Sequence, residues 1–397
     1  MNKVKEQYEA YPYPERDPRD EKKRLITGSP SHPLELDHFL FRGQRDWSQG
    51  TRILVAGGGT GDALIQLAQT LTTAKAPYEI TYIDLSTAAR KIAEARAKAR
   101  GLTGITFITG SILDAEAYGP FDYIDCCGVL HHLPNPQLGF DALAAALTPD
   151  GGLGCMVYAP YGRAGVYPLQ QAFTSLLKDL PVKAQLKRAK QIFAALPEGH
   201  PFKRNPHLVD HNASDAGFYD LLLHSQDQPF AIDTLCDSLQ RAGLRFAGTP
   251  QAALYDLSRF SDVPDGMSSV QQMALAERLD GTIKAHVIYA QVADREDSIA
   301  TGTSTKDVPH LKGMTAQALA QKITRDGKIT VTLNGEKHHV SLAKQAAKVI
   351  AGIDGRRDLE MIRQASGLDP LAFKAIWAPV HRALTPFGLM IYSRLLR

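Results

Sequence analysis

A run of glycines that follows a short apolar segment constrains the fold of this chain more than any other feature of its sequence. Residues 53–56 form a continuous apolar run, which is typical of a strand covered on both faces of a sheet. Four of the next five residues are glycines, and residues 62–71 then carry apolar side chains at helical spacing. Glycines let the backbone turn sharply and let a ligand lie against it. We therefore predict a ligand-binding turn between a buried strand and a helix.

The alternation of apolar runs and helical segments continues for most of the chain. A turn is predicted at residues 149–152, where Pro, Asp and two Gly occur together. Strands that alternate with helices indicate parallel crossover connections, so we predict an α/β fold with a doubly wound, mostly parallel sheet of seven strands. Beyond the first strand, the others are expected at residues 79–85, 105–110, 121–130, 153–159 and 284–292, and at the end of residues 229–248.

Composition divides the chain into an N-terminal arm or lid at residues 1–50, a sheet domain at 51–295, a polar linker at 296–310 and a C-terminal domain at 311–397. The sheet domain carries a helical cap insertion at about residues 161–230, where the strand pattern is interrupted. In the C-terminal domain, an Asn-Gly pair marks the turn of a hairpin that helices follow. This order predicts a small winged-helix-like unit.

Charge and cysteine content restrict the cellular compartment and the kinds of partner that can be expected. The chain has 397 residues, a formal net charge of +3 and four cysteines, which form no disulfide framework or paired metal spacing. No segment has the character of a signal peptide or the ~20 consecutive apolar residues of a membrane span. We therefore expect a cytoplasmic protein with no membrane partner. The charges of the C-terminal domain are spread out, so a nucleic-acid partner is not expected, whereas a homodimer stays open.

An acidic residue at the end of the second predicted strand points to a nucleoside ligand. Asp84 lies where a carboxylate can accept both hydroxyls of a ribose at the carboxyl edge of the sheet. The glycines help to distinguish between nucleoside cofactors, because a dinucleotide fingerprint requires Gly-x-Gly-x-x-Gly and the glycines here are spaced Gly-x-Gly-x-Gly. The spacing therefore disfavours an NAD-dependent oxidoreductase.

Five segments within roughly residues 50–160 resemble the successive motifs of class I S-adenosylmethionine-dependent methyltransferases, in the order and spacing of that family. They are ILVAGGGTGD, YIDLS, FITGSILD, FDYIDCCGVLHHL and LTPDGGLGCMVY. The resemblance implies a transferase with a Rossmann-like fold that binds S-adenosylmethionine and releases S-adenosylhomocysteine. It implies cofactor contacts by Ala56, Gly57, Gly59, Gly61, Asp84, Leu85, Ser111, Ile112, Cys127 and Gly128.

The same resemblance implies a role for each part of this set. The glycine loop wraps the methionine end of the cofactor, Ser111 and Ile112 lie beside the adenine, and Cys127 lies near the sulfonium. Two positions depart from the family pattern. The family often has an acid two residues before the first loop glycine, where this chain has Val55, and its adenine-contacting Asp is Ser111 here. Both departures predict weaker cofactor contacts at these positions.

Segments outside these motifs show narrower resemblances. YEAYPYPERDP and YDLLLHSQDQPFAIDTLCDSLQRAGLRFAG resemble the methyltransferase module of bacterial tetratricopeptide-repeat methyltransferases, although the repeats themselves are absent. SHPLELDHFLF and IDGRRDLEMI are similar to segments of bacterial protein-lysine methyltransferases. The second resemblance implies a protein lysine as the methyl acceptor.

Three residues are candidates for catalysis. His132 follows the fourth predicted strand, where the transferred methyl group is expected, and its ring can take a proton from a hydroxyl or an amine. His224 lies in the segment that carries the narrower resemblance and is a second candidate base. Tyr11 lies between two other tyrosines in a proline-rich segment, which is predicted to be extended and to form either a lid over the cofactor or an arm on the surface. No metal site is predicted, because the adjacent Cys126 and Cys127 would point to opposite faces of a strand.

The sequence thus predicts methyl transfer from S-adenosylmethionine to a small molecule or a peptide. A protein lysine methyltransferase is the alternative within the same chemistry. A non-catalytic module that senses or binds the cofactor and an NAD-dependent oxidoreductase are the alternatives of other classes. Methyl transfer requires mainly that a nucleophile is aligned with the reactive sulfonium and that water is excluded, so the residues do not identify the acceptor.

Overall fold

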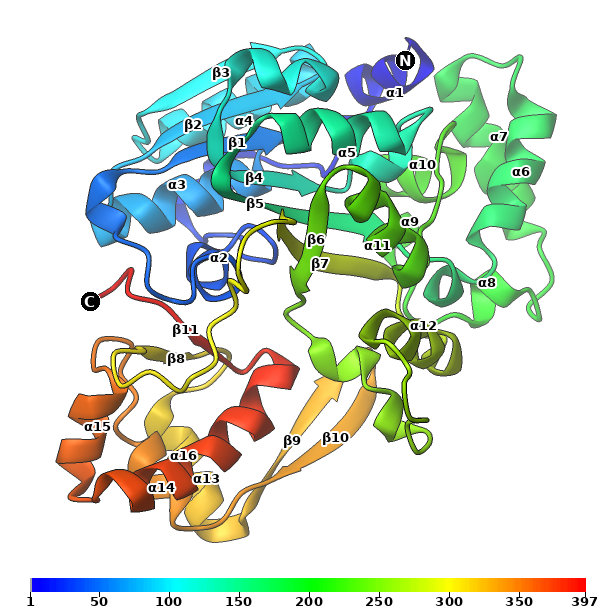
Figure 1. The fold of residues 1–397 in the computed structure, drawn as a ribbon. Helices are drawn as coiled ribbons and strands as arrows, with labels where there is room; N and C mark the ends of the chain where they lie inside the picture. Colours follow the sequence, from blue (N-terminus) through cyan, green and yellow to red (C-terminus); the bar gives the residue numbers. More distant parts are fainter. Residues whose placement is uncertain (1) are drawn as a thin grey trace.

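A seven-stranded sheet organises the computed structural model, which describes the chain from Asn2 to Arg397 (Figure 1). Its strand order is β3-β2-β1-β4-β5-β7-β6, and β7 runs antiparallel to both of its neighbours. The predicted doubly wound, mostly parallel α/β sheet is therefore confirmed. The strands are β1 (Arg52–Ala56), β2 (Glu79–Asp84), β3 (Ile105–Thr109), β4 (Phe121–Cys127), β5 (Leu147–Tyr158), β6 (Leu244–Gly248) and β7 (Ala285–Val292).

Helices cover both faces of this sheet, which explains why β1 is apolar throughout. Leu54 and Ala56 belong to the core on the side of α5 (Pro136–Ala145) and α11 (Ile232–Arg241). Ile53 and Val55 point the other way, as the alternation along a strand requires, into a second core. That second core is formed with α2 (Pro33–Leu40), α3 (Asp62–Ala74) and α4 (Thr87–Ala99).

The turn predicted at residues 149–152 is wrong. These residues lie inside β5, where Gly152 pairs with Tyr123 of β4 and with Gln291 of β7. The ladder between β4 and β5 shifts register between Phe121 and Tyr123, and this irregularity accommodates the Pro-Asp-Gly-Gly stretch within a continuous strand. Turn-forming residues therefore mark a bulged strand here and not its beginning.

The N-terminal segment begins as a helix, α1 (Asn2–Ala10), and continues without regular structure to a short 3-10 helix, η1 (Pro18–Lys22). The prediction of an extended segment is therefore wrong for Tyr8, which lies in α1, and residues 11–17 form bends and irregular structure. The difference has a simple cause, because the first proline is Pro12 and the residues before it are free to form a helix.

The buried side chain of Arg96 ties this N-terminal segment to the glycine-rich turn. Its Nε donates to Glu21 at 2.6 Å, and its Nη1 donates to Asp62 at 2.7 Å and to the carbonyl oxygen of Thr60 at 2.8 Å. Arg16 in turn pairs with Asp62 at 2.6 Å. One guanidinium from α4 therefore holds α3, the glycine-rich turn and η1 in a fixed arrangement.

The interruption between β5 and β6 is helical, as predicted. Its helices share an apolar core of their own and stand beside the sheet, at the right of Figure 1. They are α6 (Val166–Leu177), α7 (Val182–Ala194), α8 (Pro201–Arg204), α9 (Asp210–Ala213) and α10 (Asp215–Leu223). A further helix between β6 and β7, α12 (Ser269–Asp280), was not anticipated in the sequence analysis.

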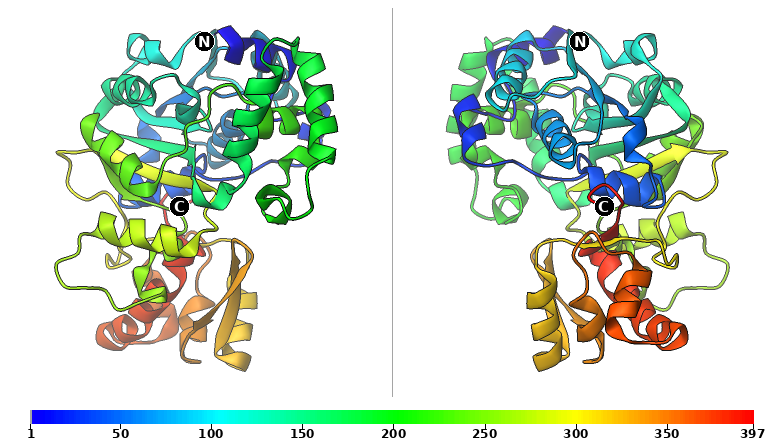
Figure 2. Two further views of the ribbon diagram at one scale, coloured as in Figure 1. Left: turned by 90° about the vertical axis from the view of Figure 1, so that its right-hand side faces the viewer. Right: turned by 90° about the vertical axis from the view of Figure 1, so that its left-hand side faces the viewer.

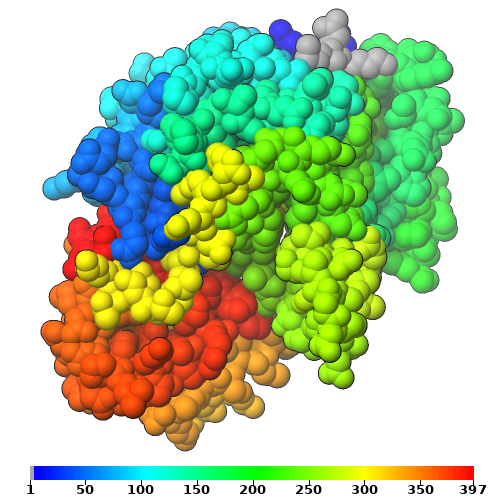
Figure 3. Space-filling view, viewed as in Figure 1, coloured from blue at the N-terminus to red at the C-terminus, as the bar shows by residue number. Residues whose placement is uncertain are grey.

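The C-terminal part of the chain has a separate apolar core and lies below the sheet in all ribbon views (Figure 2). Its predicted hairpin is present as β9 (Lys328–Leu333) and β10 (Glu336–Ser341), with Asn334 and Gly335 at the turn in left-handed conformations. Its other elements are β8 (Pro309–Leu311), α13 (Ala316–Asp326), α14 (Ala346–Ile350), α15 (Leu359–Ser366), α16 (Pro370–Leu384) and β11 (Met390–Tyr392). In the space-filling view this part forms the lower end of the molecule (Figure 3).

Hydrogen bonds to α2 attach the C-terminal part to the sheet. Ser393 donates a hydrogen bond to the buried Asp37 carboxylate at 2.7 Å, and the backbone N–H of Tyr392 donates to the His38 ring at 3.2 Å. Ser298, in the predicted linker, also donates to the carbonyl oxygen of Phe39 at 2.7 Å. Among the helices from Asn2 to Arg397, none combines the length and the apolar character that a bilayer crossing requires.

We predict that Arg96→Met destabilises the protein by at least about 1.5 kcal/mol, because Glu21, Asp62 and the carbonyl oxygen of Thr60 each lose a charged hydrogen-bond donor, while Arg100 still pairs with Glu21. The side chains of Arg96 and Glu21 are only 1% and 5% exposed. Arg19→Met is the matched control, since Arg19 also pairs with a carboxylate but is 89% exposed. Urea denaturation measures both variants, and equal effects of the two substitutions would contradict the assignment of Arg96 as a structural tie.

Candidate functional site

A cavity of roughly 480 Å³ lies at the carboxyl ends of β1, β2, β4 and β5. The predicted cofactor residues, with one exception, come together in its lining, where they approach from four strands and their following loops. Those that line it are Ala56, Gly57, Gly59, Asp84, Leu85, Ser111, Ile112, Cys127 and Gly128. The exception is Gly61, which precedes α3 and packs on α4, where an added Cβ would lie 2.9 Å from the Cβ of Ala93.

The N-terminal segment lies directly on the glycine-rich turn. Gly59 has a φ of 52°, and a Cβ there would meet the carbonyl oxygen of Tyr13 at 2.9 Å. The Thr60 hydroxyl donates to the carbonyl oxygen of Pro14 at 2.6 Å. Tyr8 and Tyr13 also line the cavity. The tyrosine segment therefore covers the turn, which agrees with the lid that the sequence analysis considered.

Asp84 is held in a fixed orientation by two backbone groups. The N–H of Gly59 donates to its Oδ2 and the N–H of Ser86 donates to its Oδ1, each at 2.8 Å. Burial raises the pKa of this carboxyl, and the two backbone hydrogen bonds oppose that shift. Each oxygen keeps a lone pair for a further donor. The carboxylate is thus prepared to accept the two hydroxyls of a ribose.

A polar cluster of five side chains borders the same cavity: Tyr8, His132, Tyr158 and Asp220, which line it, and His224. The Tyr8 hydroxyl donates to Asp220 Oδ1 at 3.1 Å, and the Tyr158 hydroxyl donates to Asp220 Oδ2 at 3.3 Å. His224 Nε2 lies 3.3 Å from the Tyr8 hydroxyl, and the rings of His132 and His224 stack with their centroids 3.7 Å apart. Residues from the N-terminal helix, the sheet and the cap thus meet at one place.

Backbone hydrogen bonds fix the tautomers of the two histidines. His132 Nδ1 lies 2.8 Å from the carbonyl oxygen of Gln226, which can only accept, so Nδ1 carries the proton of the neutral ring and Nε2 keeps its lone pair. The N–H of Gln226 donates to His224 Nδ1 at 3.1 Å, so the proton of that ring is on Nε2, which faces Tyr8. Burial lowers the pKa of His224 and so favours this neutral form. His132 is therefore the histidine of the cluster with a free basic nitrogen.

The hydrogen bonds of these histidines also determine which ring nitrogens are free to bind a metal ion. Ligand atoms of His132, Asp220 and His224 lie within 4.8 Å of one another, as do those of His131, His132 and Asp227. Both nitrogens of His224 are engaged, however, one as an acceptor and one as a donor, so this ring has no lone pair left for a cation in the arrangement described. The prediction that the chain binds no metal stays a prediction.

The three candidate catalytic residues are not brought together. His132 and His224 belong to the polar cluster, whereas the ring of Tyr11 stacks on Tyr219 with centroids 5.4 Å apart and does not line the cavity. The structure thus places Tyr8, which lies in α1, among the residues that line the cavity, and Tyr11 outside it. Sequence reasoning also missed Asp220, which lies in α10, whereas His224 is the residue directly after the end of that helix.

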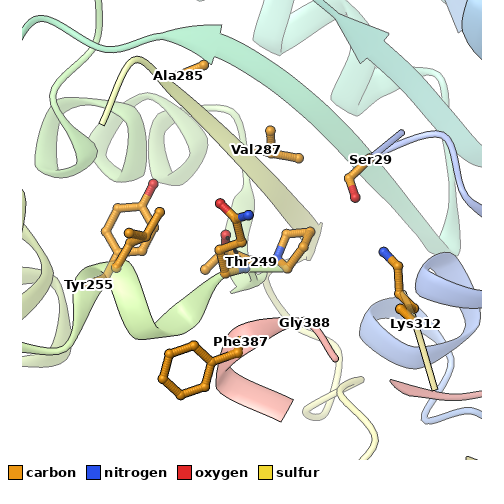
Figure 4. Close-up of a pocket in the computed structure, with 11 residues that line it drawn as sticks. Ser29, Thr249, Tyr255, Ala285, Val287, Lys312, Phe387 and Gly388 are labelled. Carbon is orange, nitrogen blue, oxygen red and sulfur yellow. Dashed lines mark hydrogen bonds between the residues drawn. The ribbon is translucent and has the colours of Figure 1, made fainter. Parts of the chain in front are cut away.

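A second cavity of roughly 240 Å³ lies between β7 and the C-terminal part (Figure 4). Val287, Lys312 and Phe387 are among the residues that line it. Ser29 lines both cavities, and Val287 pairs in register with Met156, which lines the larger one. The two cavities therefore adjoin across β5 and β7.

Comparison with known proteins identifies the family of the sheet domain. Residues 54–153 match the family model described as a methyltransferase domain. An uncharacterized protein from Synechococcus sp. (strain ATCC 27144 / PCC 6301 / SAUG 1402/1) is 30% identical over 289 residues, which are 70% of this chain and 68% of that protein. The chain belongs to the same protein family as the Synechococcus protein.

Solved structures share the fold over nearly the whole chain. PKMT2 from Rickettsia typhi matches with a TM-score of 0.65 and 14% identity, covering 93% of this chain and 77% of PKMT2. The structure of PKMT2 in complex with AdoHcy matches with a TM-score of 0.62 and 13% identity, covering 92% and 75% of the two chains. With the match to the methyltransferase domain, the protein is an S-adenosylmethionine-dependent methyltransferase, as predicted, and the oxidoreductase alternative is set aside.

We predict that Asp84→Ala raises the Kd for S-adenosylhomocysteine at least about 100-fold, because hydrogen bonds to a charged group contribute about 1.5–3 kcal/mol each and two ribose hydroxyls lose their acceptor. Isothermal titration measures the change. Asp46→Ala is the control, since Asp46 also accepts a backbone N–H at the start of a short helix but lies outside the cavity. An unchanged Kd in Asp84→Ala would show that the cofactor does not use this carboxylate.

A second prediction concerns His131, which is fully buried and whose ring nitrogens have no hydrogen-bond partner within residues 2–397. Burial lowers the pKa of His131 below its usual 6.5, so the unfolded chain takes up a proton that the folded chain refuses as the pH falls through that value. Between pH 7.5 and 5.5, this uptake lowers the free energy of unfolding of the unchanged protein by about 1.4 kcal/mol, and His131→Leu should abolish this part of the decrease. Urea denaturation at both pH values tests this, with the exposed His339→Leu as control; identical slopes for all three proteins would refute it.

Proposed function

We propose that this methyltransferase transfers its methyl group to an amine nitrogen, carried by a small molecule, a peptide or a protein side chain. The carboxylate of Asp220 carries this proposal. Asp220 is 3% exposed, lines the cavity beside His132, and accepts hydrogen bonds from two tyrosines. No Lys or Arg side chain among residues 2–397 forms a salt bridge with Asp220, although the charge of Arg163 acts on it from farther away.

Burying a carboxylate without a paired cation costs free energy, and a cationic ligand bound beside it lowers that cost. Burial raises the pKa of Asp220, against the opposing effects of His132, the Tyr8 hydroxyl and the more distant charge of Arg163. An ammonium group placed beside Asp220 would supply the missing positive charge and donate hydrogen bonds to its oxygens. A neutral hydroxyl acceptor would leave the charge uncompensated. The charge balance of the cavity therefore favours an amine over an alcohol.

The aromatic lining of the cavity supports the same choice. Tyr8, Tyr13 and Tyr158 all line it. The faces of aromatic rings attract ammonium groups, and this attraction is strongest where water is excluded. The guanidinium of Arg163, which lies 3.6 Å from the centre of the Tyr158 ring, already uses one such face. Tyr8 and Tyr13 come from the N-terminal segment, so this segment would close over both the cofactor and the acceptor.

His132 supplies the proton acceptor that this reaction needs. An ammonium group has no lone pair for attack, so it must first lose a proton, and Nε2 of His132 has a free lone pair at the cavity. The amine nitrogen then forms a bond to the methyl carbon while the carbon–sulfur bond breaks, and the sulfonium leaves as the neutral thioether of S-adenosylhomocysteine. The proton on His132 passes to solvent after the product departs. His224 positions His132 through ring stacking and the shared backbone of Gln226.

A protein lysine is one amine of this kind and is the second candidate for the acceptor. The sequence segments similar to bacterial protein-lysine methyltransferases favour it, and the fold similarity to PKMT2 extends over 93% of the chain. A small amine is the first candidate because the cavity must already hold the cofactor within roughly 480 Å³ and the N-terminal segment covers it. Transfer of labelled methyl groups in cell extract, separated into small molecules and proteins, distinguishes the two; a protein that binds the cofactor but labels neither fraction would support a sensing module.

We predict that His132→Gln lowers kcat at least about 100-fold and leaves the Kd for S-adenosylhomocysteine within about twofold, because it removes the proton acceptor and keeps the cavity filled. Asp220→Asn should instead raise KM for the acceptor identified by labelling. Tyr11→Phe is the matched control, since Tyr11 lies outside the cavity. Methyl groups found on oxygen, or full activity of Asp220→Asn, would contradict the amine proposal.

A further inference from the structure

We propose that Asp125 and Gln66 bind the amino-acid end of the cofactor, Asp125 through the cofactor's ammonium group and Gln66 through its carboxylate. The inference rests on the cofactor and is independent of the amine acceptor. It starts from the departure at Val55, where the glycine-rich turn lacks the acid that the family often has. A carboxylate that serves the same part of the cavity comes from the neighbouring strand.

The register of the sheet places Asp125 beside Val55. The two residues are direct partners in the parallel ladder between β1 and β4, so their side chains lie on the same face of the sheet about 5 Å apart. Val55 and Asp125 both line the cavity, and Gly57 is two residues after Val55 in the sequence. A carboxylate on β4 can therefore occupy the region that an acid at position 55 of β1 would occupy, directly below the glycine-rich turn.

Asp125 is buried, and no cation pairs with it among residues 2–397. It is 1% exposed, its Oδ2 lies 3.3 Å from the Tyr123 hydroxyl, and that hydroxyl also donates to the carbonyl oxygen of Pro30 at the shorter distance of 2.9 Å. Its Oδ1 has no hydrogen-bond partner in the described part of the chain. Burial raises the pKa of Asp125 to about 7, against the hydroxyls of Ser31 and Tyr123. A positively charged ligand group would compensate this carboxylate.

Gln66 offers the opposite polarity in the same cavity. It lies on α3, is 2% exposed and lines the cavity. Its Oε1 accepts the N–H of Gly28 at 2.7 Å, which fixes the orientation of the amide, and its Nε2 has no partner among residues 2–397. An unsatisfied buried donor and an unsatisfied buried carboxylate are each costly when empty. Together they match a zwitterion, which presents one carboxylate and one ammonium group.

The cofactor carries two positive charges, the ammonium and the sulfonium. The depth of Asp125 in the cavity indicates that it binds the ammonium. The family resemblance places the sulfonium near Cys127, at the end of β4. Asp125 lies two residues earlier on the same face of the strand, which is about 6–7 Å deeper. The methionine end is the part of the cofactor that the glycine-rich turn encloses, so the ammonium lies closer to Asp125 than the sulfonium does.

Isothermal titration of the full chain with three ligands tests this assignment. S-adenosylhomocysteine carries both groups, decarboxylated S-adenosylmethionine keeps the amine without the carboxylate, and 5′-methylthioadenosine lacks both. Asp125→Asn should raise the Kd at least about tenfold for the first two ligands and less than twofold for the third. Gln66→Glu, which keeps the bond to Gly28 and loses the donor, should weaken only S-adenosylhomocysteine by about tenfold or more.

Asp84→Ala is the control, because all three ligands contain the ribose and all three should weaken. If the unchanged protein binds none of the three, the cofactor assignment itself fails, which is distinct from failure of this inference. Equal weakening of all three ligands in Asp125→Asn, or no weakening of any, would overturn the role of Asp125. Thermal unfolding of each variant identifies any general loss of folding, and circular dichroism confirms that the titrated proteins are folded.

Discussion

The buried ion pair between Arg96 and Glu21 is the interaction on which the geometry of the cavity depends. A guanidinium can be buried only if its donors are satisfied, and here they are satisfied by a carboxylate of the N-terminal segment, by Asp62 at the start of α3 and by the backbone of the glycine-rich turn. The pair therefore does more than stabilise a helix. It fixes the distance between the turn that receives the cofactor and the segment that covers it.

The pattern of the sequence predicted the sheet and the cofactor edge because both depend on local features. An apolar strand, a set of glycines and a helix occupy consecutive residues, and Asp84 ends a strand that the same pattern predicts. The edge of a parallel sheet then brings these ends together without further information. The bulge in β5 was missed because proline and glycine residues usually end a strand, and only the pairing with β4 and β7 keeps it continuous.

The polar cluster could be predicted only in part. Its members are far apart in the sequence: Tyr8 and Asp220 are separated by 212 residues, and the helical insertion must fold against α1 before they meet. His132 was accessible to prediction because it follows a strand that ends at the cofactor edge. Tyr11 was chosen over Tyr8 because the prolines suggested an extended segment, and a helix rotates its side chains by a different angle per residue than an extended segment does. Tautomers and unpaired carboxylates have no signature in a single sequence.

The contact between the N-terminal segment and the glycine-rich turn has a consequence for the rate of turnover. Tyr13 and Pro14 lie on the turn itself, and the carbonyl oxygen of Pro14 accepts the hydroxyl of Thr60. If this segment acts as a lid over a cofactor seated in the turn, it has to lift before the spent cofactor can leave. Motions of this kind take microseconds to milliseconds. Product release, governed by a few hydrogen bonds at the start of the chain, can then limit how fast the enzyme works even when the transfer step is rapid.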